Sequence, residues 1–230
     1  MDVRWHGHSF FSLVCKNGTK ILIDPFIENG LTRLRMPDFS PDLILVTHGH
    51  DDHVGSAPEF GVPCIATFEL AEHLEERGAR GSIGMNVGGS HVAGGIRFWC
   101  TPAMHSSGLH GGKYGGVASG FVVDDGETRF YHAGDTGLFS DMRAVIHDLL
   151  KPHVAALPIG DRYTMGPVHA ARAVEWLGVS TAVPMHYSTF EAIQQDPHDF
   201  EKLVGNAARV VVPQVDGGFV QQGSRFVKML

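Results

Sequence analysis

Val46-Thr47-His48-Gly49-His50-Asp51-Asp52-His53 is the segment of the chain that says most about its fold class and its chemistry. It follows an apolar run, so a buried β-strand is expected to end here in a tight polar turn. Histidine nitrogens and carboxylate oxygens are ligands that suit zinc and neighbouring divalent metals. In an extended chain, His48 and His50 point to the same side and can share one cation. Asp52 and His53 lie past the turn, where they can reach a second cation a few ångströms away.

Three further ligand-type side chains occur downstream, at single and well-spaced positions. Each follows a run typical of a buried strand and a local breaker; they are His105, Asp135 and His186. Residues just beyond strand ends are held on a rigid frame and remain open to solvent. Each of the three alone would be interpreted as a core or surface residue. Together with the first cluster they complete two metal sites.

The order of these residues is similar to the signature of the metallo-β-lactamase superfamily: His48-x-His50-x-Asp52-His53, then a lone histidine, a Gly-Asp pair and a last histidine. The similarity extends to a small bacterial and archaeal family of uncharacterised metal-dependent hydrolases related to L-ascorbate-6-phosphate lactonase. Segments along the whole chain carry this resemblance: Trp5–Ser9, Ile23–Phe26, Tyr131–Met142, Leu157–Pro167 and Val183–Tyr187. Within them, Thr164–Pro167 is the segment that points to the smaller family.

The resemblance implies two divalent metal ions per chain. It implies one ion on His48, His50 and His105, a second ion on Asp52, His53 and His186, and Asp135 as the bridge between them. A bridging carboxylate can hold two ions about 3.5–4 Å apart, and the absence of cysteine from the set argues against structural zinc. Zinc is the default metal, with manganese, nickel and iron as alternatives. Asp52 and Asp135 are the candidate catalytic residues.

The activity implied by the resemblance is hydrolysis, in which a hydroxide at the dinuclear site attacks a small ester, lactone or phosphoester. A dinuclear-iron redox protein of the same fold is the first alternative. His50 argues against it, because that branch commonly has glutamate at this position. A non-catalytic metal-binding protein is the second alternative, and it is weakened because no ligand position is substituted.

Other residues are candidates for supporting the site or binding substrate. Asp24 follows an apolar run and could fix the metal-binding turn by hydrogen bonds, or could form a simple strand-end turn. By resemblance His8 faces the site, with a core histidine as the alternative. Arg162 and Tyr163 are candidate substrate-binding residues, because a guanidinium can pair with phosphate or carboxylate, although Arg162 could equally be a solvated cation. The loop Gly111–Gly116 is expected on the same rim, which favours an anionic small-molecule substrate.

The composition predicts a cytoplasmic enzyme. The 230 residues carry a formal net charge of −7 with scattered lysine and arginine, which argues against a nucleic-acid partner. Three cysteines in apolar surroundings predict reduced, buried thiols: Cys15, Cys64 and Cys100. No apolar run is long enough to span a bilayer, and no export leader is expected after Met1. A homo-oligomer is left open.

The expected fold class is α/β, and the resemblance implies a four-layered αββα sandwich built as a single domain over residues 1–230. Its two halves, roughly 1–115 and 116–230, are each expected to supply a βα layer, with the metals at the sheet edges. Strands are expected at 3–6, 10–15, 20–23, 43–46, 64–67, 96–100, 117–123, 128–132, 154–157, 181–184, 210–212 and 226–228. Helices are expected at 69–77, 140–150, 168–177 and 190–204.

Overall fold

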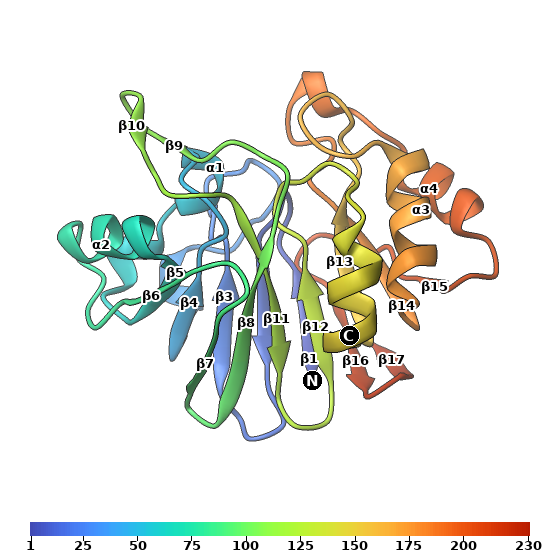
Figure 1. Cartoon of the computed structure of the whole chain (residues 1–230), viewed down its shortest axis with the longest axis horizontal. Coiled ribbons are helices and arrows are strands. Elements are labelled where there is room, and N and C mark those ends of the chain that lie inside the picture. Colours follow the sequence, from blue (N-terminus) through green and yellow to red (C-terminus); the bar gives the residue numbers. More distant parts are fainter.

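Two β-sheets packed face to face form the centre of the molecule (Figure 1). The computed structural model describes all residues from Met1 to Leu230. The first sheet has eight strands in the order β17-β16-β1-β2-β3-β4-β5-β6. Their bounds are β1 (Asp2–Trp5), β2 (Phe11–Val14), β3 (Lys20–Ile23), β4 (Leu43–Leu45), β5 (Cys64–Thr67), β6 (Ile83–Met85), β16 (Gly218–Gln222) and β17 (Arg225–Met229).

The second sheet has seven strands in the order β15-β14-β13-β12-β11-β8-β7. Their bounds are β7 (Ser90–Ala93), β8 (Ile96–Pro102), β11 (Ser119–Asp124), β12 (Arg129–His132), β13 (Val154–Pro158), β14 (Thr181–Met185) and β15 (Arg209–Val210). Two short strands, β9 (Gly108–Leu109) and β10 (Lys113–Tyr114), pair only with each other. They form an arm that projects at the upper left of Figure 1.

Helices cover the outer faces of the sheets and complete the four-layered αββα sandwich, so the expected fold is confirmed. The longer ones are α2 (Phe68–Glu76), the π-helical segment η3 (Met142–Leu150), α3 (Pro167–Leu177) and α4 (Pro197–Val204). The short ones are α1 (Asp51–Val54), η1 (Met36–Asp38), η2 (Ala57–Phe60) and η4 (Glu191–Ile193). In α2, Leu70 and Leu74 lie one turn apart on the buried face, and that face packs on β5 and β6.

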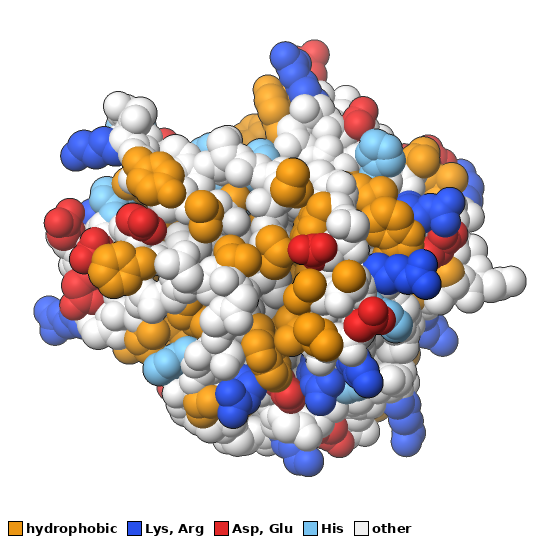
Figure 2. Space-filling view, viewed as in Figure 1, with side chains coloured by type: hydrophobic (Ala, Val, Ile, Leu, Met, Phe, Trp, Pro, Cys, Tyr) orange, Lys and Arg blue, Asp and Glu red, His pale blue; other side chains and the backbone are white.

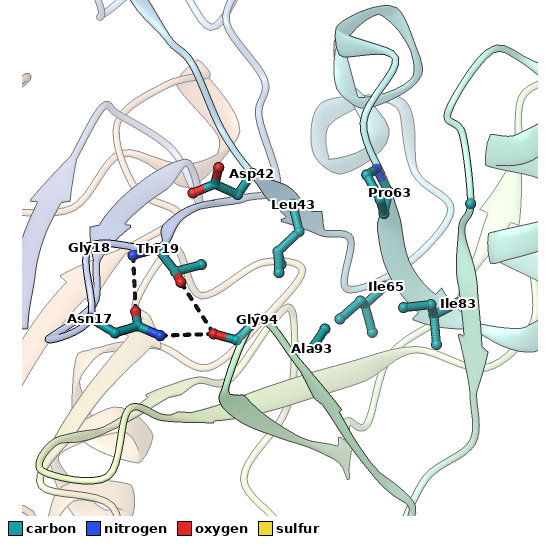
Figure 3. A pocket seen from close by; sticks show the side chains of 11 residues that line it. Asn17, Gly18, Thr19, Asp42, Leu43, Pro63, Ile65, Ile83, Ala93 and Gly94 are labelled. Carbon is teal, nitrogen blue, oxygen red and sulfur yellow. Dashed lines mark hydrogen bonds between the residues drawn. The ribbon is translucent and has the colours of Figure 1, made fainter.

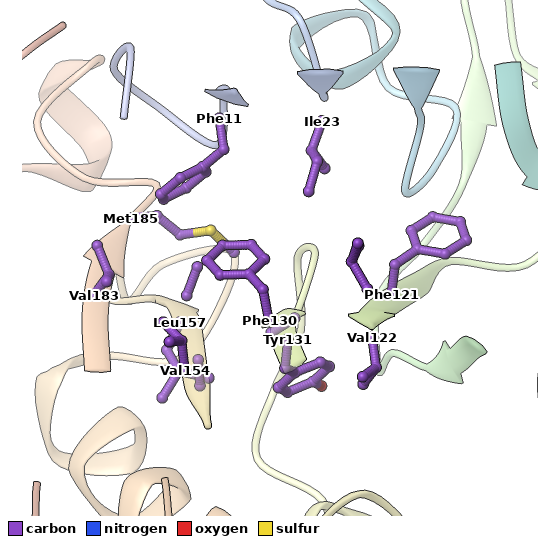
Figure 4. Packing of buried hydrophobic residues seen from close by; sticks show 14 of the residues in the cluster. Phe11, Ile23, Phe121, Val122, Phe130, Tyr131, Val154, Leu157, Val183 and Met185 are labelled. Carbon is purple, nitrogen blue, oxygen red and sulfur yellow. The ribbon is translucent and has the colours of Figure 1, made fainter. Parts of the chain in front are cut away.

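Aromatic side chains fill the space between the two sheets (Figure 4). Phe11 of the first sheet meets Phe130 of the second, with ring centroids 5.7 Å apart. Phe121 points toward the first sheet like Phe130, whereas the neighbouring Val122 and Tyr131 point the other way, because successive strand residues face opposite sides. Strands β11 and β12 are thus buried on both faces, which explains their nearly continuous apolar sequence.

The helix expected over 190–204 is wrong in its first half, because the structure has η4 and α4 there, separated by a break. Proline at 197 forms the first turn of α4, and the residue before a proline avoids the helical conformation. Asp196 instead caps the new helix, with its side chain accepting a hydrogen bond from the N–H of His198 at 2.9 Å.

The two sheets do not divide near residue 115 as expected. Strands β7 and β8, from the first half of the chain, join β11 in the second sheet, and β16 and β17 return to the first sheet beside β1. Strand β16 was not predicted, because the polar Gln221 occupies a fully buried position. Its amide accepts from the Thr181 hydroxyl at 3.1 Å and donates to the Gly223 carbonyl at 2.9 Å. This buried amide breaks the alternation that marks a strand.

Strand direction brings the candidate ligands to one edge of the sandwich. Strands β3 and β4 are parallel, and so are β12, β13 and β14. The carboxyl ends of parallel strands meet at the same sheet edge. Asp24, His48, Asp135 and His186 each lie one to three residues beyond such an end.

A cavity of about 580 Å³ opens at the opposite end, where β3, β4 and β5 begin (Figure 3). Leu43, Ile65 and Ile83 give it an apolar wall. The amide of Asn17 donates to the carbonyl of Gly94 at 2.8 Å along its edge. None of the candidate metal ligands lines this cavity, so the chemistry lies at the other end of the sandwich.

The surface and the cysteines match the composition. On the face shown in Figure 2, lysine and arginine side chains are spread around the periphery with acidic side chains between them. All three cysteines are free and buried, as predicted, and burial raises the pKa of Cys15 and of Cys64 to about 12. None of the helices combines the length and the apolar character that crossing a membrane requires.

Candidate metal centre

The turn after β4 positions the first candidate ligands. His48 follows the strand closely, and His50 is the N-cap of α1. The backbone N–H of His53 donates to the carbonyl of His50 at 3.0 Å, which places Asp52 and His53 on the first turn of this helix. Aspartate is favoured there by the helix dipole. Four ligand-type side chains therefore come from six consecutive residues.

The remaining three candidates follow strands of the second sheet. His105 lies after β8, Asp135 after β12 and His186 after β14. Gly134 permits the sharp approach of Asp135, because its φ is +61° and a Cβ there would clash with the carbonyl of Ser119. His186 has a φ of 53°, a backbone region that non-glycine residues rarely occupy. Backbone strain of this kind often accompanies functional sites.

One group of candidate ligands consists of His48, His50 and His105. Their ligand nitrogens all lie within 4.8 Å of one another, and His48 Nε2 is 2.9 Å from His50 Nδ1. Burial lowers the pKa of His48 and of His105, which favours the neutral imidazole that binds metal. The group is suited to one divalent ion.

A second group consists of Asp52, His53, His186 and His8, again with ligand atoms within 4.8 Å of one another. Asp135 lies between the two groups. Its Oδ2 is 2.9 Å from His186 Nε2 and 3.6 Å from His105 Nε2, and its Oδ1 is 3.4 Å from His53 Nε2. The carboxylate thus approaches both groups from a buried position.

Several buried polar atoms of the cluster have no hydrogen-bond partner, among them His53 Nε2, His186 Nδ1 and Asp135 Oδ1. Such atoms are rare in folded proteins, because leaving one unsatisfied costs about 1–3 kcal/mol. Imidazole nitrogen and carboxylate oxygen are also the donor types that zinc and neighbouring metals take. The residues present therefore fit divalent metal ions.

Asp24 accepts a hydrogen bond from the ring nitrogen of His53 that points away from Asp135. Its Oδ2 accepts from His53 Nδ1 at 2.7 Å and from the Thr47 hydroxyl at 2.7 Å. Its Oδ1 accepts from the backbone N–H of Thr47 at 2.8 Å. A proton on Nδ1 leaves Nε2 of His53 as the free nitrogen, which faces Asp135. The structure thus places Asp24 in contact with the turn that carries the candidate metal ligands.

His8 contacts Asp52 in a similar way. Its Nε2 is 3.0 Å from Asp52 Oδ2, and its Nδ1 is 2.9 Å from the Thr189 hydroxyl. Burial lowers the pKa of His8 to about 4, although Asp52 acts in the opposite direction. The ring is therefore neutral near pH 7, and donation from Nε2 to Asp52 leaves Nδ1 to accept from Thr189. Thr189 was not predicted, since nothing in the sequence shows that it meets a residue so distant along the chain.

Metal binding should release a proton and strengthen as the pH rises. Burial opposes a charge on His53, but the carboxylates of Asp135 and Asp24 outweigh it and raise the pKa of His53 well above its usual range. The metal-free ring is therefore protonated at neutral pH and must lose this proton to bind a metal. Affinity should increase with pH until the raised pKa is passed, and then level off.

Calorimetric zinc titrations in two buffers of different ionisation enthalpy measure this proton release. A release near zero across about pH 6–8, together with a pH-independent affinity, would contradict the prediction.

The predicted substrate rim is only partly assembled. Tyr163 lines a cavity of about 300 Å³ at the cluster of candidate ligands, whereas Arg162 does not. The Arg162 guanidinium instead lies over the Tyr163 ring, 5.4 Å from its centroid. The loop Gly111–Gly116 belongs to the arm of β9 and β10 and does not line this cavity.

Two residues that the sequence did not reveal, Ser106 and Phe190, also line the cavity at the cluster. Both lie shortly after a candidate ligand, one residue past His105 and four past His186. That proximity is a signal that could have suggested them. Asp51, in contrast, faces away from the cluster, and its Oδ2 lies 3.1 Å from Nδ1 of the exposed His110.

A four-layered sandwich with this His/Asp cluster at its strand ends defines a class, the metal-dependent hydrolases of the β-lactamase type. The family Beta-lactamase superfamily domain matches residues 19–187. The chain belongs to this superfamily, and it is a metal-dependent hydrolase.

Its relatives agree with that assignment. The chain is 42% identical to a UPF0173 metal-dependent hydrolase of Methanobrevibacter smithii, over 98% of this chain and 96% of the relative. It is 45% identical to another from Methanoregula boonei, over 89% of this chain and 90% of the relative. Among solved structures, a metallo hydrolase from Ignicoccus hospitalis superposes with a TM-score of 0.85 at 37% identity, covering 94% of this chain and 96% of that one.

Proposed function

We propose that the chain uses two divalent metal ions, with zinc as the default, to hydrolyse a small ester, lactone or phosphoester. The observation that carries the proposal is the position of Asp135, whose carboxylate approaches both ligand groups. When bound, such ions lower the pKa of a coordinated water from about 16 to about 7 and polarise the oxygen of the scissile group.

The protein side chains hold and orient this centre. The carboxylates of Asp52 and Asp135 neutralise only half of the charge of two divalent ions when the imidazoles are neutral. The site would therefore stay electropositive and favour a substrate that carries negative charge. Asp24 and His8 keep the ligand atoms of His53 and Asp52 directed at the centre through hydrogen bonds.

Metal analysis together with a substrate screen tests this proposal. Protein reconstituted with zinc should hold two equivalents per chain, and a chelator should abolish hydrolysis of at least one lactone, carboxylic ester or phosphoester. A single equivalent would overturn the dinuclear assignment. Hydrolysis that persists without metal would overturn the proposed mechanism.

The substrate is expected to carry an anionic group that reaches Arg162, whose guanidinium lies over the ring of the cavity residue Tyr163. A hydrogen bond to a charged partner contributes about 1.5–3 kcal/mol. Arg162→Ala should therefore raise KM for an anionic ester about tenfold or more, and should change KM little for the neutral analogue. Steady-state kinetics on the two esters measures the effect, with the exposed Arg143→Ala as the control. Equal responses of both esters would show that Arg162 is an ordinary solvated cation.

We also propose that the chain acts as one domain in the cytoplasm. Strands from both ends of the chain share the first sheet, which supports one folding unit. The free, buried thiols support a reducing compartment.

A further inference from the structure

The cavity at the cluster of candidate ligands is lined by those ligands and by a few largely aromatic side chains. Its volume is about 300 Å³, at the small end of the range for ligand pockets. Apart from five candidate ligands, only Ser106, Tyr163 and Phe190 line it. No lysine or arginine is among them, so the wall beside the metals is formed by two aromatic rings and one hydroxyl.

The turn that carries Tyr163 is held in place by backbone hydrogen bonds. The backbone N–H of Met165 donates to the carbonyl of Thr136 at 2.9 Å, next to Asp135. The N–H of Asp161 donates to the carbonyl of Met165 at 3.0 Å, which closes the turn. Tyr163 is nevertheless 53% exposed, so its ring can contact a ligand on the side that the Arg162 guanidinium does not cover.

Phe190, the second aromatic residue of the cavity, packs against His8, which in turn contacts the candidate ligand His186. Its ring meets the His8 ring edge to face, with centroids 5.4 Å apart, and His8 in turn lies 4.1 Å from the His186 ring. Phe190 remains 44% exposed. Two half-exposed aromatic rings therefore border the space next to the candidate ligands.

We infer that Tyr163 and Phe190 determine specificity by packing on an apolar group of the substrate, adjacent to its scissile bond. This inference rests on the proposed function, since it concerns the substrate of the same site. The cavity volume of about 300 Å³ accommodates an apolar group of about the size of one ring or a short branched chain. Because the Arg162 guanidinium lies over the Tyr163 ring and does not line the cavity, the favoured substrate is a compact molecule with an apolar centre and an anionic outer end.

Binding of two simple carboxylates to the zinc-loaded protein tests the inference without requiring turnover. Phenylacetate and acetate present the same anion, and only phenylacetate carries an apolar ring. Calorimetry should show phenylacetate binding about tenfold more tightly than acetate, as expected when an aromatic ring is removed from water. Tyr163→Ala and Phe190→Ala should each remove most of this difference.

Two further variants separate packing from other roles. Tyr163→Phe keeps the ring and loses only the hydroxyl, so it should retain the preference for phenylacetate. Phe68→Ala removes an exposed aromatic ring at the start of α2, outside this cavity, and should also retain it. Zinc content is measured for every variant, so that loss of the metal is not mistaken for loss of the aromatic wall.

The hydrolysis of methyl phenylacetate and methyl acetate separates failure of this inference from failure of the proposed function. If both esters are hydrolysed with equal kcat/KM and both acids bind equally, the inference is overturned while the proposed function stands. If neither ester is hydrolysed but the ring-dependent binding and its loss in the alanine variants are observed, the aromatic wall is supported and these esters give the proposed function no support. A preference that survives in a Tyr163→Ala/Phe190→Ala double variant would also overturn the inference.

Discussion

Asp135→Ala should abolish hydrolysis and reduce metal occupancy at both sites. Asp135 is the side chain that approaches both ligand groups, at 2.9 Å from His186 Nε2 and 3.6 Å from His105 Nε2. Without it, two close cations would repel each other across a centre with one carboxylate fewer. Removing one preorganised electrostatic contact typically lowers kcat by about 10²- to 10³-fold. The loss of activity in Asp135→Ala should exceed this. Metal analysis and kcat/KM on the same preparations measure both effects.

Asp51→Ala is the matched control, because it also removes a carboxylate from the metal-binding segment. Asp51 faces the exposed His110 and not the cluster, so this variant should keep both its metal and most of its activity. Exposed ion pairs contribute at most about 1 kcal/mol to stability. If the two variants lost metal and activity equally, the roles assigned to these carboxylates would have to be exchanged or abandoned.

Asp24→Ala should weaken both the fold and the metal site, although Asp24 is not a candidate metal ligand. The fully buried carboxylate accepts three hydrogen bonds, two from Thr47 and one from His53. Removing one partner of a buried ionic pair costs about 3–5 kcal/mol of stability. Metal affinity should fall about 10- to 100-fold, because His53 loses the contact that orients it. Thermal unfolding and zinc competition titrations measure the two losses.

Asp24→Asn separates the two effects. The amide keeps the bond from the Thr47 backbone but presents N–H groups to His53 Nδ1. His53 would then accept on Nδ1 and carry its proton on Nε2, the nitrogen that faces Asp135. Metal affinity should therefore fall as in the alanine variant while stability falls less. Wild-type affinity in Asp24→Asn would mean that Asp24 only forms a strand-end turn, and Asp42→Ala, an exposed aspartate before β4, controls for lost charge.

The metal-ligand candidates could be predicted because their signals are local. A dense His/Asp turn after an apolar strand, and single ligands after later strands, are visible in the sequence alone. Parallel strands then bring those ends together, and the structure shows all seven candidates in one cluster. Individual strands could be predicted for a related reason, since apolar strands such as β3 and β5 were located to the residue, whereas their arrangement in four layers was implied by the family resemblance.

The missing parts depend on contacts between distant residues. The contact of His8 with Thr189 spans 181 positions, and no local pattern encodes it. Gln221 in β16 looks like a surface residue until Thr181 is seen to pair with it. Phe190 was placed in a helix, because the break imposed by Pro197 was overlooked, and its role in the cavity wall was therefore hidden.

The pairing of β1 with β16 also determines the order in which the chain can fold. Residues 2–4 pair with residues 218–220, and the amino group of Met1 donates to the carbonyl of Gln221 at 2.7 Å. Contacts so far apart form slowly, because a long loop must close first. During synthesis, all seven candidate ligands leave the ribosome before the strand that covers β1. The nascent chain therefore exposes an open strand edge until late in translation, and such an edge can pair with other chains.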